Sequence, residues 1–352
     1  MYSFKSRWPF IFDSNSKIFW RIFIKLKKLI IGILISIIFI YFSFHGVSFE
    51  KILKVFQNLR YIFLIPSIIL LLSITILRSL RLGVMLSTME KIHQRTLLPI
   101  TCVGFMGIAL VPMRIGELIR PYLVSKESQI SFSSALATIF VERMIDSLTI
   151  ILILFLIIFT SPLPEWIVRT GYGFLAVFVF FLFFVCFLYF NTKFSLQLLR
   201  SLTKILPLKL VAKVEGMISS FTEGLKIIGS PVRLGYTILL SFVIWGISGL
   251  VIYSFFFLLN LQLSLLNAFI VLIITIIGIS LPAGPGFIGN FQFACIIALS
   301  IFGVPKDIAL AFSMVYYFIG IGIQILLGLI FLPFLKLSFE DLNKIKIFTR
   351  PS

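Results

Sequence analysis

Ionisable side chains gather within strongly apolar sequence between residues 111 and 146. A charge at the centre of a bilayer costs roughly 2.5–3.5 kcal/mol on insertion scales, so such groups pair with one another or face a water-filled cavity. Charges in this setting are candidates for a functional site by default. The members of the group are Arg114, Glu117, Arg120, Glu142, Arg143 and Asp146.

Three of these charges lie well inside a predicted long helix over residues 133–160. Uncharged sequence flanks Glu142, Arg143 and Asp146 on both sides, so they do not mark the tip of the helix. Glu142 and Asp146 are four residues apart and share a helix face. Two like charges on one face need a cation, and either Arg143 or an arginine of the preceding segment is suited to that role.

Arg114 and Arg120 also have a simpler interpretation. Arginines near helix ends often extend their heads to the membrane interface and do no chemistry. The sequence leaves open whether these two residues are such anchors or ligands of a polar group.

The composition requires a membrane environment. The 352 residues are 60% hydrophobic and only 12% charged, whereas an ordinary soluble domain has about 25% charged residues. Several apolar runs approach or exceed the ~20 residues that cross a bilayer as a helix. We therefore predict an all-α, polytopic helical membrane protein with about six to eight spans.

The net charge of +18 comes from Lys and Arg that flank the predicted spans. This distribution matches the positive-inside rule and attraction to anionic lipid, so we predict cytoplasmic termini and no nucleic-acid partner. Arg78 and Arg81 are interpreted as closing a span on the cytoplasmic side. Residues 45–60 are expected to form a connecting loop. The predicted divisions are a basic arm at 1–28, a transmembrane domain at 29–335 with a cytoplasmic amphipathic segment at 191–233, and a basic tail at 336–352.

The sequence suggests no metal site and no cofactor. Three cysteines without CxxC spacing and two distant histidines give neither a structural zinc site nor a disulfide framework. No catalytic residue is predicted with this pattern.

Two apolar segments end in sequences that break a helix. Residues 98–113 end at VPMRIG, and residues 265–281 run into LPAGPG, with proline and glycine at a density that interrupts a helix. Whether residues 98–113 and 265–302 are re-entrant or fully spanning stays open here. The break residues are Pro112, Gly116, Pro282, Gly284, Pro285, Gly286, Gly289, Asn290 and Gln292.

The two breaks resemble each other and predict an inverted repeat. A long helix follows each break, containing ALAT at residues 135–138 and ALAF at residues 309–312. The charge pattern places the flanks of the two copies on opposite sides of the membrane. Broken helices at corresponding positions of two inverted halves are typical of a transporter's central site.

At these residues the chain resembles the lysylphosphatidylglycerol synthase transmembrane family, also called flippase-like. The resemblance covers about residues 25–336 and implies a lipid-handling protein of a bacterial or archaeal plasma membrane. Many relatives carry Glu at the position of Gln292 and a charged residue where this chain has Tyr316 and Tyr317. We expect no synthesis of lysyl-lipid, because no aminoacyl-transferase domain follows Leu332. The resemblance is carried by Pro112, Arg114, Gly116, Glu117 and Arg120, by Glu142, Arg143 and Asp146, and by PAGPGFIGNFQ at residues 282–292.

Three functions remain as hypotheses. In a lipid flippase, Arg114 and Arg120 would hold an anionic headgroup through bidentate phosphate contacts. The acids would balance these arginines or meet the cationic headgroup of an aminoacylated lipid. The lipid, anionic or aminoacylated, would be a phospholipid or a polyprenyl glycolipid. In a membrane-embedded enzyme, Glu142 and Asp146 would act as acid, base or metal ligands. In an accessory protein that partners a lipid-synthesis enzyme, the charges would form a structural network.

Overall fold

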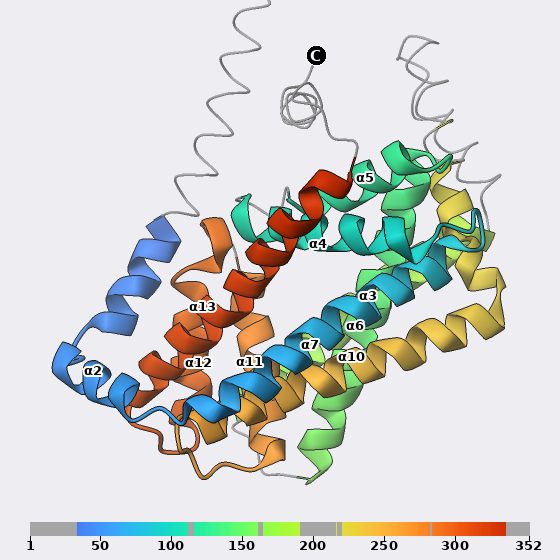
Figure 1. Cartoon of the computed structure of the whole chain (residues 1–352). Helices are drawn as coiled ribbons and strands as arrows, with labels where there is room; N and C mark the ends of the chain where they lie inside the picture. The colour runs from blue at the N-terminus through green and yellow to red at the C-terminus, as the bar shows by residue number, and fades with distance from the viewer. Residues whose placement is uncertain are drawn as a thin grey trace, which may run out of the picture.

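The computed structural model describes residues 34–111, 116–160, 165–190, 216, 220–281 and 284–335. Throughout these ranges the regular elements are helices, which confirms the predicted all-α polytopic class (Figure 1). The elements in chain order are the helix Leu34–Phe44, α2 (Phe49–Gln57), η1 (Tyr61–Phe63), α3 (Leu64–Leu86), α4 (Gln94–Leu110), α5 (Ile119–Glu127), α6 (Phe132–Thr160), α7 (Glu165–Phe190), η3 (Leu225–Gly229), α10 (Pro231–Leu258), α11 (Leu265–Ser280), η4 (Pro285–Phe287), α12 (Asn290–Ser300), α13 (Lys306–Phe331) and η5 (Leu332–Phe334).

Four helices in the described ranges are long and apolar enough to cross a membrane. They are Tyr61–Leu86, Phe132–Thr160, Pro231–Leu258 and Lys306–Phe334. A fifth candidate is the bent pair Leu34–Phe44 and Phe49–Gln57, whose axes meet at 78°.

The expectation of a loop at residues 45–60 is wrong, because α2 occupies its middle. Its buried Ile52 faces the protein, and an exposed ion pair of 2.8 Å joins Glu50 to Lys54 one turn later. Lys51 also reaches Asp307 at the start of α13, 3.3 Å away. The charges of this segment therefore belong to an amphipathic helix rather than to a mixed loop.

The two halves of the chain meet along α3 and α10, which run antiparallel. The backbone N–H of Arg60 donates to the carbonyl of Leu258 at one end, 2.9 Å away. Ser67 and Ser254 share a hydrogen bond of 2.7 Å further along. Arg81 donates to the hydroxyl of Ser241 at the other end, 2.6 Å away. Partners late in α3 are thus early in α10, as oppositely directed helices require.

The order of helices repeats after this pair. The helices that follow α3 and α10 have 17 and 16 residues, the short helices after the two breaks have 9 and 11, and the final helices α6 and α13 have 29 and 26. In Figure 1, α6 begins on the side of the bundle where α13 ends. The helices therefore correspond in order and length, and the pairs α3/α10 and α6/α13 run in opposite directions, as the predicted inverted repeat requires.

The second broken segment folds as a helical hairpin. A Cβ at Gly278 on α11 would meet that of Ala294 on α12, and Thr275 lies 3.6 Å from the sulfur of Cys295. Neither helix reaches the ~20 residues that a comfortable span needs. The connecting turn requires glycine at Gly286 and Gly289, whose φ angles are +66° and +88°. The geometry favours a re-entrant pair over two full spans.

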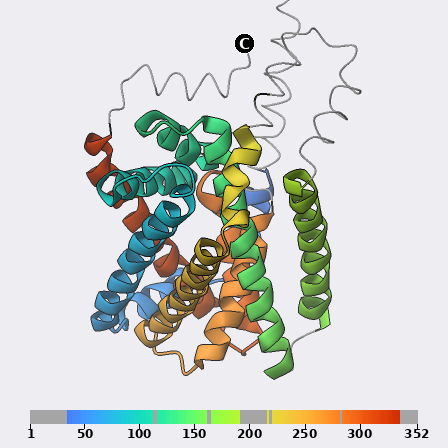
Figure 2. The ribbon, with the colours of Figure 1, turned by 90° about the vertical axis from the view of Figure 1, so that its right-hand side faces the viewer.

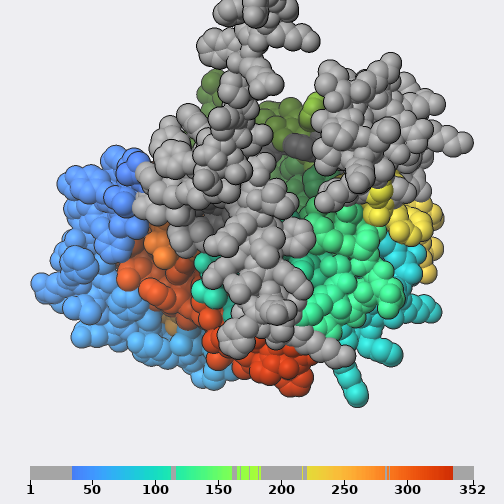
Figure 3. Space-filling model, turned by 90° about the horizontal axis from the view of Figure 1, so that it is seen from above, coloured from blue at the N-terminus to red at the C-terminus, as the bar shows by residue number. Residues whose placement is uncertain are grey.

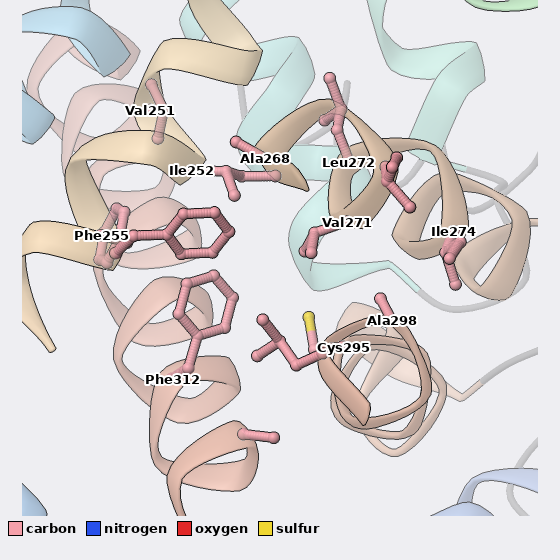
Figure 4. Close-up of a cluster of buried hydrophobic side chains, with 14 of the residues drawn as sticks. Val251, Ile252, Phe255, Ala268, Val271, Leu272, Ile274, Cys295, Ala298 and Phe312 are labelled. Atoms are coloured by element: carbon pink, nitrogen blue, oxygen red, sulfur yellow. The ribbon is translucent and has the colours of Figure 1, made fainter. Parts of the chain in front are cut away.

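The core of the second half lies where α10, α11, α12 and α13 converge. Figure 4 shows aromatic rings of α10 and α13 packed beside aliphatic residues of α11 and small residues of α12. Phe255 and Phe312 are both fully buried, with their ring centroids 6.3 Å apart. This cluster fixes the position of the hairpin against the long helices.

Both ends of the described chain lie on one side of the bundle (Figure 1). Figure 3 looks onto that side and shows the blue N-terminal helices and the red end of α13 apart from the yellow segment near η3. Leu225 and Ile227 of η3 are fully buried, and a Cβ at Gly224 would collide with the backbone of Ser134 on α6. Residues 1–28, most of 191–219 and 336–352 are outside the described residues, as are Pro112, Arg114 and Pro282.

Replacing Gly286 with Ala should lower the stability of the fold. A left-handed backbone costs a residue with a Cβ roughly 1–2 kcal/mol, and the new Cβ would lie 2.5 Å from the hydroxyl of Tyr317. We expect Gly286→Ala to lower the apparent Tm in detergent by several degrees. The control is Gly322→Ala on α13, which has no atom within 4 Å of a new Cβ. Equal apparent Tm values for the two variants would contradict the requirement for glycine at position 286.

Candidate functional site

Glu142 is the centre of a buried charge network. Its side chain is fully buried on α6 and accepts hydrogen bonds from two arginines that come from different helices. Arg120 of α5 donates from Nη1 and Nη2 to the two carboxylate oxygens, at 3.0 and 3.1 Å. Arg81 of α3 donates from Nη2 to Oε1 at 2.9 Å. One carboxylate therefore ties α3, α5 and α6 together.

Asp146, one turn further along α6, completes the network. It accepts from both terminal nitrogens of Arg81, with Nη2 3.1 Å from Oδ2. The indole Nε1 of Trp245 on α10 donates to Oδ1 at 3.0 Å. Arg81 also donates to Ser241. The second half of the chain thus contacts the charge network through α10.

Glycine in α4 makes room for Arg120. A Cβ at Gly104 would collide with Cγ of that arginine, so only glycine lets the side chain cross α4 on its way to Glu142. The next residue, Phe105, lies 4.9 Å from the guanidinium carbon of Arg120 and 4.5 Å from that of Arg78. The negative face of the ring helps to hold two cations close to each other.

The network is balanced within itself. Arg81 and Arg120 carry two positive charges, and Glu142 and Asp146 carry two negative charges, with side chains at most 8% exposed. Breaking such a buried pair by removing one partner typically costs about 3–5 kcal/mol, because the other charge is left without compensation. These four residues therefore act first as a structural unit.

A cavity lined by both charged and apolar side chains lies beside this network, between the two halves, and we call it the polar cavity. Its volume is about 400 Å³, and its wall includes residues of α3, α4, α6, α10, α11, η4, α12 and α13. Four charged side chains reach it: Arg78, Glu117, Arg143 and Asp146. The neutral polar groups on its wall include Ser248, Ser280, Tyr317 and Gln324. The cavity can hold a polar group of moderate size inside an otherwise apolar bundle.

Among the described residues of this site, arginines outnumber carboxylates by one. Arg143 lies 3.9 Å from Glu117 and 3.8 Å from Asp146, beyond the ordinary length of a charge-assisted hydrogen bond. Arg78 has a ring contact with Phe105 but no carboxylate within ion-pair distance among the described residues. Arg78, Arg81, Arg120 and Arg143 thus face three acids, Glu117, Glu142 and Asp146.

The structure separates the predicted site residues into two groups. Arg120, Glu142 and Asp146 form the buried network, whereas Glu117, Arg143 and Asp146 line the cavity. Arg120 is fully buried and does not line the cavity. Arg114 lies outside the described residues.

The predicted break residues shape the backbone around the cavity. Gly116 packs against the backbone of Gly107, where a Cβ would collide. Hydrogen bonds hold the second break: Gly284 N donates to Ser36 Oγ (2.8 Å), Gly289 N to Gln292 Oε1 (2.8 Å), Asn290 Nδ2 to Gly278 O (3.4 Å), and Tyr317 OH to Gly286 O (2.8 Å). Pro285 is the first residue of η4.

The expectation that Arg78 and Arg81 close a span is wrong, because helix α3 extends to Leu86. Arg81 is 1% exposed and ion-paired, and Arg78 faces the cavity. Both are interior because α3 continues for another turn to Leu86, whose side chain is fully buried. The apolar residues after Arg81 were the signal in the sequence that these arginines lie within a helix.

The sequence profile of the lysylphosphatidylglycerol synthase transmembrane region matches residues 29–328. The chain belongs to this family. The resemblance found in the sequence is therefore confirmed, and the family identifies a multi-pass membrane protein linked to lipid handling. The residues of the buried network and of the cavity all lie within the matched range.

One relative is the UPF0104 membrane protein of Methanocaldococcus jannaschii. It is 28% identical to this chain over 226 residues, which are 63% of this chain and 91% of the relative. No solved structure matches the chain.

Glu142→Gln should destabilise the protein strongly. The change leaves Arg81 and Arg120 short of one buried negative charge, at a cost of about 3–5 kcal/mol. Glu165→Gln is the matched control, because it also removes a carboxylate from an arginine pair, but an exposed one on α7 worth at most about 1 kcal/mol. Thermal unfolding in detergent should separate the two variants clearly. Similar melting curves would show that the Glu142 network does not support the fold.

Proposed function

We propose that this family member binds the headgroup of an anionic lipid in the polar cavity and translocates it across the membrane. One observation carries the proposal: a charged cavity of about 400 Å³ lies between two inverted halves. Among the described charges of the site, arginines outnumber carboxylates by one. A site with spare positive charge favours an anion such as a phosphodiester.

Arg78 and Arg143 are the proposed phosphate ligands. Both line the cavity, and their guanidinium groups are less occupied than those of Arg81 and Arg120. Arginine suits phosphate because its planar fork donates two parallel hydrogen bonds. Arg120 acts instead as a positioning residue, since it holds Glu142 in place. Arg114 remains a proposed headgroup ligand on the basis of the sequence.

The acidic residues of the cavity would let it bind headgroups that carry hydroxyl or amine groups as well as a phosphate. Glu117 and Asp146 can accept hydrogen bonds from headgroup hydroxyls, or pair with the amine of an aminoacylated lipid. A headgroup that carries both a phosphate and a donor would therefore match the mixed wall best. This supports a phospholipid or polyprenyl glycolipid with a polar, hydrogen-bonding end.

The inverted halves provide a route for transport. In transporters built from such repeats, one half rocks against the other around a central site, which opens to each side in turn. Here the wall comes from both halves, and the glycine turn at Gly286 and Gly289 lies beside it. Binding a monoanion would offset the surplus positive charge of the described residues.

The other two hypotheses, an enzyme and an accessory protein, receive different support from the structure. An enzyme that uses Glu142 as an acid or base is disfavoured, because both of its oxygens are engaged by arginines. An accessory role is supported by the self-balanced network, but that role needs no charged cavity. We propose a bacterial or archaeal plasma membrane with cytoplasmic termini. Both described ends lie on one side of the bundle, and the Lys and Arg that flank the predicted spans favour the cytoplasm for that side.

Arg78→Gln should reduce transport of an anionic lipid without unfolding the protein. A hydrogen bond to a charged group contributes about 1.5–3 kcal/mol, so flux of fluorescent phosphatidylglycerol in proteoliposomes should fall about tenfold or more. Arg78→Lys should retain part of the flux, because the charge remains. Arg95→Gln, an exposed change at the start of α4, is the control.

Three outcomes would decide the matter. Flux that depends on Arg78 and exceeds that of phosphatidylcholine supports an anionic-lipid transporter. Equal flux in Arg78→Gln and Arg95→Gln would contradict the role of the cavity. Absence of flux above protein-free vesicles would contradict transport altogether and favour the accessory role.

A further inference from the structure

A second hollow lies on the side of the bundle, between α6, α7 and α11. Its volume is about 320 Å³, and its wall is almost entirely apolar. Leu154 of α6, Phe178 of α7 and Ile273 of α11 represent the three sides. We call this the tail groove. In Figure 2, α7 stands at the edge of the bundle beside α6.

The tail groove and the polar cavity are adjacent. Five residues line both hollows, and we call the place where they lie the junction. The shared residues are Arg143, Ser147, Ile150, Ile276 and Ser280. An apolar groove beside a charged cavity matches the two ends of an amphiphile, with its hydrocarbon in the groove and its polar group in the cavity.

Arg143 lies at this junction. Its side chain is 36% exposed, and its nearest carboxylate oxygens are 3.8 and 3.9 Å away. Its buried Nε has no hydrogen-bond partner among the described residues. The hydroxyl of Ser147, one turn later on the same helix, donates to the backbone carbonyl of Arg143, 2.8 Å away. The guanidinium group of Arg143 is therefore the donor at the junction, where an amphiphile changes from hydrocarbon to phosphate.

We propose that the hydrocarbon tail of the transported lipid lies in the tail groove while its phosphate contacts Arg143. This inference rests on the proposed function for the headgroup, and it adds where the tail goes. The lipid then enters sideways from the bilayer, between α7 and α11, and its tail stays in an apolar environment throughout. Leaving the tail in hydrocarbon avoids exposing it to water during translocation.

Two valines of α7 provide a matched test of the groove. Val177 lines the groove, whereas Val179 does not, yet their side chains are 55% and 53% exposed. Val177→Trp places a large ring in the groove, and Val179→Trp places the same ring outside it. Both variants are made in the full chain, reconstituted in vesicles, and compared by thermal melting to confirm that they are folded.

The measurement is photo-crosslinking with phosphatidylglycerol that carries a diazirine in one acyl chain. Adducts mapped by mass spectrometry should fall on groove residues such as Met144, Phe178 and Ile273. Filling the groove displaces several methylene groups, so Val177→Trp should lower these adducts about tenfold or more, with Val179→Trp unchanged. Equal adducts in the two variants, or adducts spread evenly over the outer surface, would overturn the proposal.

A second arm tests the phosphate at the junction. Arg143→Gln should weaken groove adducts of the phosphatidylglycerol probe but not those of a diacylglycerol probe, which has the same tails and no phosphate. Equal loss with both probes would contradict a phosphate contact at Arg143. The two proposals can also fail separately. If Arg78→Gln leaves flux unchanged while the acyl-chain probe still labels the groove, the tail groove is supported and the proposed headgroup site is rejected.

Discussion

A carboxylate held between two guanidinium groups is the constraint on which the rest of this structure depends. Glu142 is fully buried, and its ligands Arg81 and Arg120 come from helices before and after the first break. Such a group is stable within a membrane protein only if every charge is compensated. Three neighbours support this arrangement: Gly104 leaves room for Arg120, the ring of Phe105 lies against the same arginine, and Ser241 accepts a hydrogen bond from Arg81.

The network also determines where a ligand can bind. Because Arg81 and Arg120 are occupied by Glu142 and Asp146, the charges left facing the cavity are those of Arg78, Arg143 and Glu117, with Asp146 shared. The fold therefore separates structural from ligand-facing arginines on the same few helices. The two inverted halves meet at this point, so a movement of either half changes the wall of the cavity.

The sequence predicted the elements of this site better than their pairings. Glu142 and Asp146 inside an apolar helix required a cation, and that requirement is met. One cation, Arg120 of the preceding segment, was among those predicted, and it pairs with Glu142. The other, Arg81, was missed, because it lies 61 residues away from Glu142 and local spacing says nothing about such a contact. Arg78 was misplaced because arginines near the end of an apolar run resemble interfacial anchors. The breaks and the repeat were visible as proline and glycine patterns, but the tail groove depends on how α6, α7 and α11 pack.

The most direct test of the account is a structure of the full chain in nanodiscs rich in phosphatidylglycerol, determined by electron cryo-microscopy with lipid resolved. We expect phosphate density in the cavity, within hydrogen-bond distance of Arg78 or Arg143, and tail density that continues between α6, α7 and α11. Lipid phosphates confined to the outer surface of the bundle, with the cavity holding only water, would contradict it.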